Sequence, residues 1–94
     1  MPLTRESAEV IGLQALAWLT SRDDLLPSFL SGTGSSEADL RTRTDDPVFL
    51  GAVLDFVMLD DSFVVGFCDA HHLPYPRVME ARAALPGGEQ VHWT

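Results

Sequence analysis

One short segment of the chain places three chemically capable side chains within five residues. Cys68, His71 and His72 fall at positions i, i+3 and i+4, so on a helix they share one face. A thiolate and two imidazoles can hold a zinc ion or support nucleophilic chemistry. The structural alternative is a buried cysteine that behaves as a small hydrophobic residue, with histidines suited to the last turn of a helix. A metal or ligand site here is the second of our two hypotheses about function.

Acidic residues occur in adjacent pairs, which invites a calcium or paired-carboxylate interpretation. The three pairs begin at Asp23, Asp45 and Asp60, and each precedes an apolar segment. Acids at the start of a helix accept bonds from free backbone N–H groups and suit the positive end of the helix dipole, so capping explains the pairs. Asp55 stands alone within an apolar segment. It is either a functional carboxylate or a mark of the face that meets water, and we favour the second interpretation.

Catalytic and nucleotide-binding motifs are absent from the sequence. There is no G-x-S-x-G, H-E-x-x-H or C-x-x-C pattern. The glycine-rich segment 31–36 lacks the lysine of a phosphate-binding loop. We therefore expect no cofactor, and we favour a non-enzymatic role over an enzymatic one.

The composition is that of one folded domain with an acidic surface. The 94 residues are 46% hydrophobic and carry 14 acidic against six basic residues, a formal charge of -8. Nucleic acid is not an expected partner, because phosphates repel an acidic protein. The most apolar segment, residues 48–68, has three aspartates in its middle, which argues against a membrane span. With one cysteine and no signal-peptide pattern, the expected compartment is the cytoplasm.

Apolar residues that return every three or four positions predict helices along the chain. Asp46-Pro47 is the clearest helix start, because aspartate caps free N–H groups and proline at the first helical position gives up no bond. No alternating segment can pair with the β-branched residues of 63–67, so a strand there is excluded. The prediction is a single all-α domain, residues 1–94, built as a compact bundle of five to six short helices with a tail at 86–94. The expected helices span about 7–21, 25–30, 35–41, 47–59, 61–72 and 78–85.

The chain also resembles itself at an offset of 38 residues. Trp18 then falls on Phe56 and Phe29 falls on Phe67, and the order of helices and acidic breaks repeats. One interpretation is a duplicated three-helix unit with halves at 7–43 and 45–85, packed with pseudo-two-fold symmetry. The alternative is coincidence, because any two sets of three helices with similar caps match in apolar pattern.

The segment 48–59 is apolar on nearly every face, so its burial requires neighbours all round it or a partner subunit. Our first hypothesis is therefore a non-catalytic protein-interaction module. The expected partner is a protein, either a basic one because this chain is acidic, or a second copy of the chain in a homodimer. We expect the partner-binding residues to include Phe49, Phe56 and Asp55. Trp93 of the tail either docks back on the domain, which we favour, or anchors the partner.

Four segments carry a resemblance to a known family. They are ALAWL at 15–19, DDPVFLGAVLDFVMLDD at 45–61, ARAALPGG at 81–88 and the terminal HWT at 92–94. Together they make nearly the whole chain similar to a family of small bacterial all-helical proteins of unknown function. The resemblance implies a compact helical domain and assigns no activity, cofactor or catalytic residue.

Overall fold

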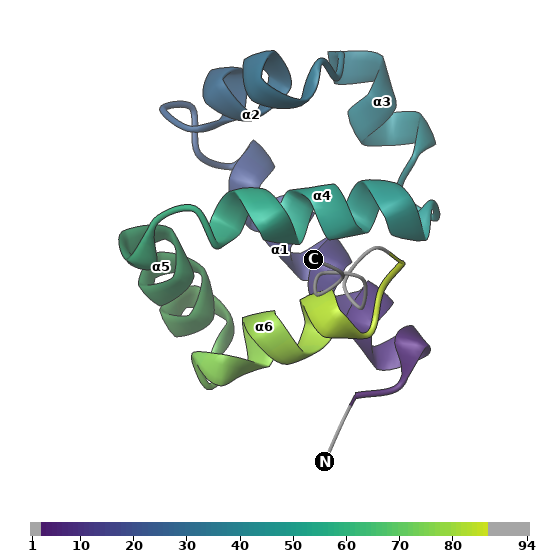
Figure 1. The fold of residues 1–94 in the computed structure, drawn as a ribbon. Helices are drawn as coiled ribbons and strands as arrows, with labels where there is room; N and C mark the ends of the chain where they lie inside the picture. Colours follow the sequence, from purple (N-terminus) through teal and green to yellow (C-terminus); the bar gives the residue numbers. More distant parts are fainter. Residues whose placement is uncertain (1–2, 87–94) are drawn as a thin grey trace, which may run out of the picture.

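The computed structural model describes residues 3–86, which form six α-helices and no strand (Figure 1). The predicted all-α class is therefore confirmed. The described part of the chain measures 34 × 26 × 26 Å along its principal axes. The helices are α1 (Arg5–Thr20), α2 (Leu26–Thr33), α3 (Glu37–Thr42), α4 (Pro47–Val57), α5 (Asp61–His71) and α6 (Pro76–Ala83).

Polar caps and prolines fix where these helices begin. The Asp46 carboxylate accepts a bond from the Val48 N–H at 3.0 Å, and Pro47 occupies the first turn of α4, as the sequence predicted. The Asp60 carboxylate caps α5 in the same way, accepting from the Ser62 N–H at 2.8 Å. These caps set the start of the two helices that follow one another through the core.

Several helix ends differ from the sequence prediction, and three of them have a clear local description. Helix α1 begins at Arg5 rather than near residue 7, because the Thr4 hydroxyl accepts the Ser7 N–H at 3.0 Å and caps an earlier turn. Helix α6 begins at Pro76 rather than near residue 78, because a proline in the first turn loses no hydrogen bond. Helix α4 ends at Val57, and the next two residues belong to the turn into α5.

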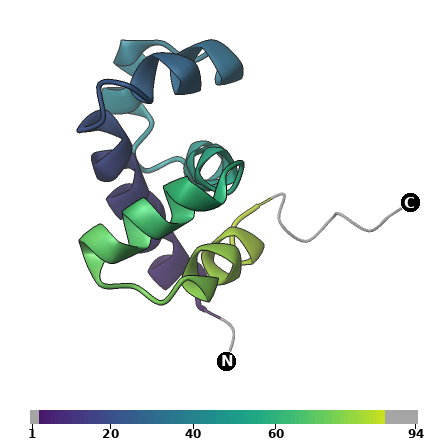
Figure 2. The same cartoon turned by 90° about the vertical axis from the view of Figure 1, so that its left-hand side faces the viewer.

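The core is centred on α4, with α1 crossing behind it in Figure 1. In both views α2 and α3 lie on one side of α4, while α5 and α6 lie on the other (Figures 1 and 2). Gly12 of α1 allows a close approach to α4, because a Cβ added there would lie 2.9 Å from the Cβ of Leu50. Neighbouring helices of the same chain therefore bury most of α4, without a partner subunit.

Helix α2 closes one side of α4 through a single aromatic side chain. The Phe29 ring is fully buried and meets the rings of Phe49 and Phe56 nearly edge-on, with centroids 6.0 and 5.5 Å apart. Edge-to-face aromatic pairs of this kind add to the free energy gained from burial alone. This cluster holds the α2–α3 segment on the core.

None of the helices in residues 3–86 combines the length and apolar character needed to cross a lipid bilayer.

Candidate functional site

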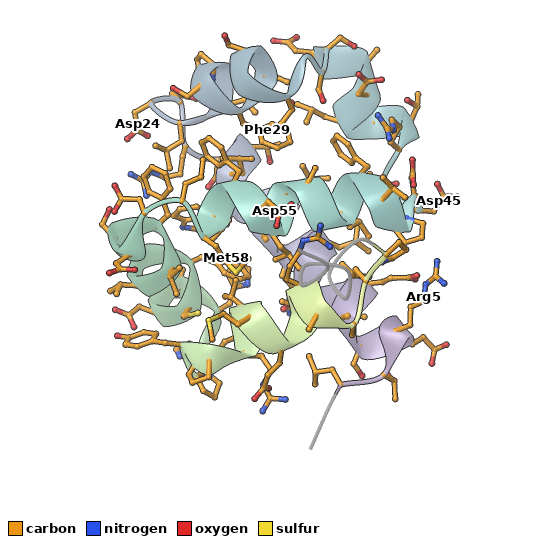
Figure 3. All side chains as sticks on the ribbon, viewed as in Figure 1. Arg5, Asp24, Phe29, Asp45, Asp55 and Met58 are labelled. Atoms are coloured by element: carbon orange, nitrogen blue, oxygen red, sulfur yellow. The ribbon has the colours of Figure 1, made fainter. Side chains whose placement is uncertain are left out.

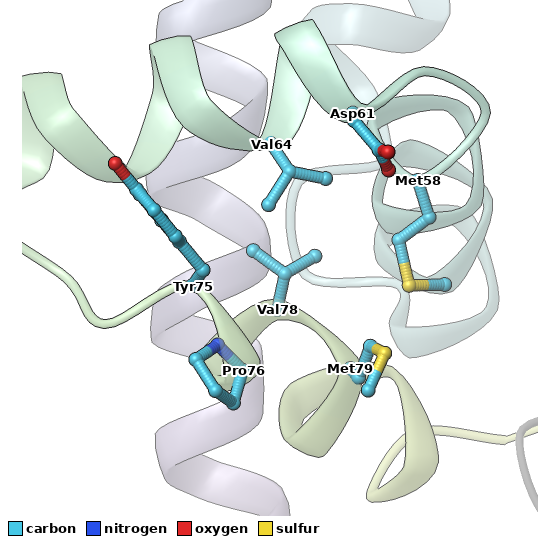
Figure 4. A pocket seen from close by; sticks show the side chains of 7 residues that line it. All are labelled: Met58, Asp61, Val64, Tyr75, Pro76, Val78 and Met79. Atoms are coloured by element: carbon cyan, nitrogen blue, oxygen red, sulfur yellow. The ribbon is translucent and has the colours of Figure 1, made fainter.

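An apolar groove lies between the end of α4, the first half of α5 and the start of α6 (Figure 4). Its volume is about 310 Å³. Asp61 is the only charged side chain among those that line it. We call it the methionine groove, defined by Met58, Asp61, Val64, Tyr75, Pro76, Val78 and Met79.

The groove is positioned by one buried residue and two polar contacts. Val78 is fully buried and seats α6 in the core. At one end of α6, Tyr75 donates a hydrogen bond to the Asp69 carboxylate of α5 at 3.0 Å. At the other end, Arg82 is ion-paired to Asp55 of α4, with Nε and Oδ1 2.6 Å apart. These contacts therefore link α6 to both α5 and α4, the other two helices that border the groove.

Two of the apolar side chains that line the methionine groove are exposed to solvent. Met79 is 63% exposed and Tyr75 is 48% exposed, whereas Met58 and Val64 are half-buried. Figure 4 shows Val64 and Val78 facing each other, with Met58 and Met79 on one side and Tyr75 on the other. Methionine is unbranched and flexible, so it adapts to the shape of an apolar partner. The groove is therefore an apolar and partly exposed surface with two flexible methionines in its lining.

The electrostatics around the groove are negative. Two hydrogen bonds, from the Ser62 backbone N–H and the Ser62 hydroxyl, hold the pKa of Asp60 below its usual range. The hydrogen bond to Asp69 and its negative charge raise the pKa of Tyr75, so the phenol stays protonated and remains a donor. Arg77 of α6 is compensated by Glu80, with Nε and Oε1 3.5 Å apart.

The residues of the groove offer little to a chemical reaction. The Tyr75 hydroxyl is already committed to Asp69, and Asp61 supplies the one carboxylate among the lining residues. A nucleophile activated by an adjacent base needs at least two polar groups within hydrogen-bond reach of each other. The structure shows no hydrogen bond between the two polar lining residues, Tyr75 and Asp61.

The structure places Cys68 inside the core rather than at a site. Its side chain is fully buried, and its Sγ lies 3.8 Å from the carbonyl oxygen of Pro74, to which the thiol donates. Burial, together with the charge of Asp69, raises the pKa of the Cys68 thiol. The cysteine thus has the environment of a small core residue that also fixes the α5–α6 turn.

The two predicted histidine ligands do not join Cys68. His71 packs on Phe67, with ring centroids 5.0 Å apart. His72 ends α5 in the left-handed conformation, with φ of 58°, and therefore leaves the helical face on which the sequence placed it. Within residues 3–86, no three histidine, cysteine or acidic side chains come together to hold a metal ion.

Two predicted partner-binding residues are core residues instead. Phe49 is 2% exposed and Phe56 is 9% exposed, because α2 folds over them and Phe29 packs between. These two side chains are therefore not exposed in the described structure, and their role in binding a partner stays a prediction. Asp55 does meet water, with its side chain 54% exposed, and pairs with Arg82. Trp93 and the tail from residue 87 onward lie outside the described residues.

The methionines of the groove were not among the residues predicted from sequence, and no local pattern marked them. Val78 and Met79 are adjacent in α6, so their side chains leave the helix about 100° apart. Val78 is buried, whereas Met79 is 63% exposed. An apolar residue left outside a short helix in this way is a candidate for binding.

Comparison with known proteins identifies the family of the chain. The family described as "Protein of unknown function (DUF3572)" matches residues 5–88, so the chain belongs to this family. Neither the search of curated proteins nor the search of solved structures found a match.

Proposed function

We propose that this member of the family is a non-catalytic protein-interaction module whose partner binds in the methionine groove. The observation that carries the proposal is the exposure of Met79 and Tyr75 beside the buried Val78. These side chains form one continuous apolar surface with the other groove residues, rather than isolated apolar residues scattered over the domain. Contiguous apolar patches rimmed by polar residues mark docking sites.

The geometry favours recognition of a helix. Helices α5 and α6 form two walls, and a third helix laid between them would contact both with one apolar face. Methionine suits this role because its three rotatable bonds let it follow different partner side chains. The proposal takes a protein, rather than nucleic acid or a membrane, as the partner and the cytoplasm as the compartment.

The alternative of a metal or small ligand at Cys68, His71 and His72 has less support. It requires a thiolate, yet Cys68 is buried and its pKa is raised. It also requires both imidazoles on one side, whereas His72 has left the helix. No observation on these residues favours it over the groove.

The proposal is tested by capturing partners with tagged protein from a lysate of the source cells. Three proteins are compared: the natural chain, Met79→Gln in the groove, and Val48→Thr as a matched control. Val48 is 58% exposed at the start of α4, away from the groove. Both substitutions add polarity at exposed positions, so neither should perturb folding.

We expect one stoichiometric partner with the natural chain and the Val48→Thr control, and loss of most of it with Met79→Gln. Retention of the same partner by Met79→Gln would contradict the groove as the binding site. Recovery of only the protein itself, at low as well as high salt, would contradict the interaction role.

A further inference from the structure

Residues that are related by the 38-residue offset make equivalent contacts in the two halves of the chain. Trp18 of α1 packs on Phe67 of α5, with ring centroids 6.0 Å apart. The offset carries these two residues onto Phe56 of α4 and Phe29 of α2, whose ring centroids are 5.5 Å apart. Each long helix is therefore covered by an aromatic residue from the short helix of the other half.

The crossing of the long helices obeys the same relationship. Gly12 and Leu50 are 38 residues apart and lie against each other where α1 packs on α4. A residue that contacts its own equivalent lies close to an approximate two-fold axis. The buried faces agree as well, in the pairs Ile11/Phe49, Gly12/Leu50, Ala15/Val53, Leu16/Leu54, Trp18/Phe56 and Leu19/Val57. These observations support the duplication that the sequence suggested.

The methionine groove departs from this likeness only at its surface. Val64 and Val78 have apolar equivalents at the offset, but three other lining residues do not. The pairs are Val64/Leu26, Val78/Leu40, Met58/Thr20, Tyr75/Glu37 and Met79/Arg41. The three polar equivalents are all exposed. Because the first half folds with polar side chains at these positions, folding does not demand apolar ones in the second half.

The charges beside the groove indicate the chemistry of its occupant. Residues 55–82 contain five acidic residues and two arginines. Arg77 is paired with Glu80 and Arg82 with Asp55, whereas Asp61 lines the groove and Asp60 precedes it. A cationic segment would be attracted to this region and an anionic one repelled, over about 10 Å at moderate salt.

We infer that the methionine groove binds a basic amphipathic helix of a partner protein. This inference rests on the proposed function and specifies its partner. The apolar face of the helix would contact Met58, Tyr75 and Met79, and its lysines or arginines would face Asp60 and Asp61. Apolar anchors spaced at i, i+3, i+4 and i+7 are the pattern that such a groove recognises.

The test uses the full chain, labelled with ¹³C at the methionine methyl groups, and two synthetic helical peptides of about 18 residues. Both peptides carry leucine at the anchor positions, and they differ only in having lysine or glutamate elsewhere. The lysine peptide should shift the methyl signals of Met58 and Met79 to saturation, and the glutamate peptide should not. Met79→Gln should weaken the binding of the lysine peptide by about tenfold, while Val48→Thr should leave its affinity unchanged. Asp61→Asn should weaken the binding of the lysine peptide by about threefold at low salt and by less at high salt.

Each opposite result has a defined meaning. Equal binding of both peptides in the groove would overturn the proposal that the partner is basic, although the groove would still be a docking site. If the lysine peptide binds the Met79→Gln variant as tightly as the natural chain, or if neither methyl signal shifts, the proposal of a helical occupant is overturned. Methyl shifts that follow the concentration of the protein alone would assign the groove to a second copy. The capture experiment with Met79→Gln judges the proposed function independently of all these results.

Discussion

Asp55 and Arg82 form a two-point ion pair that ties α4 to α6. Oδ1 and Nε are 2.6 Å apart, and Oδ2 and Nη2 are 3.1 Å apart. Arg82 also donates to the carbonyl oxygen of Pro86 at 3.0 Å. Figure 3 shows Asp55 on α4 where that helix faces solvent, with Met58 farther along toward α5. The pair holds in place the helix that presents Met79.

Gly51 makes room for this pair. A Cβ added at Gly51 would lie 2.9 Å from Nη1 of Arg82. The Arg82 side chain is only 16% exposed, so it cannot move aside freely. A glycine in the middle of a helix weakens it, and the contact with Arg82 gives a physical reason for its presence here.

Replacing Asp55 with asparagine should lower the free energy of unfolding by about 1 kcal/mol, because one half-buried guanidinium loses its anionic partner. Urea denaturation measures the change. Asp23→Asn, at an exposed acid in the turn after α1, is the matched control and should change stability by less than about 0.5 kcal/mol. Equal losses for both variants would show that the Asp55–Arg82 pair contributes nothing.

Gly12→Ala and Gly32→Ala should have opposite effects on stability. A methyl group at Gly12 meets Leu50 at the helix crossing, so α1 and α4 must separate, at a cost of about 1–3 kcal/mol. A methyl group at Gly32 meets nothing within 4 Å, so this helical position should gain up to about 1 kcal/mol. Urea denaturation of the two variants checks the prediction. Stabilisation by Gly12→Ala would contradict the close packing of α1 on α4.

Acid should destabilise the fold through two capping aspartates. The hydrogen bond from Arg43 lowers the pKa of Asp46, and the hydrogen bonds from Ser62 lower that of Asp60. Each carboxylate therefore stabilises the folded chain fully above the pKa of the unfolded state, about 4, and loses this effect as the pH falls through the lower folded value. The urea midpoint should be flat near neutral pH and fall below about pH 4. Asp46→Asn should show a smaller fall, and an identical fall would exclude Asp46 from it.

Cys68 should be chemically inert in the folded protein. It is fully buried and its pKa is raised, so a thiol reagent should modify it at least about a hundredfold more slowly than in urea. Zinc should leave the melting temperature unchanged. A fast native reaction, together with stabilisation by zinc, would restore the metal site at Cys68, His71 and His72.

The sequence predicted the helices well because their signals are local. Asp46-Pro47 and Asp60 indicate helix starts from a few adjacent residues, and apolar spacing indicates the buried faces. The early start of α1 was missed because Thr4 precedes the apolar pattern that begins near residue 7. The duplication stays a prediction, now with the paired contacts of Gly12 and Leu50 in its support.

The candidate site was predicted less well because it depends on contacts between distant segments. Phe49 and Phe56 looked available on a uniformly apolar helix, but Phe29 reaches them from α2. His72 shared a face with Cys68 only while α5 was assumed to continue through it. The methionine groove requires α5 and α6 to fold back on the end of α4, and no local pattern specifies that arrangement.

The most direct test of the methionine groove is photo-crosslinking in the source cells. A small diazirine-bearing aliphatic residue is placed at Met79 in one protein and at Val48, the exposed apolar control, in another. If the groove is the docking site, irradiation will join one specific partner protein to position 79 and not to position 48. Identical adducts from both positions, or none from position 79, would contradict the groove as a protein-binding site.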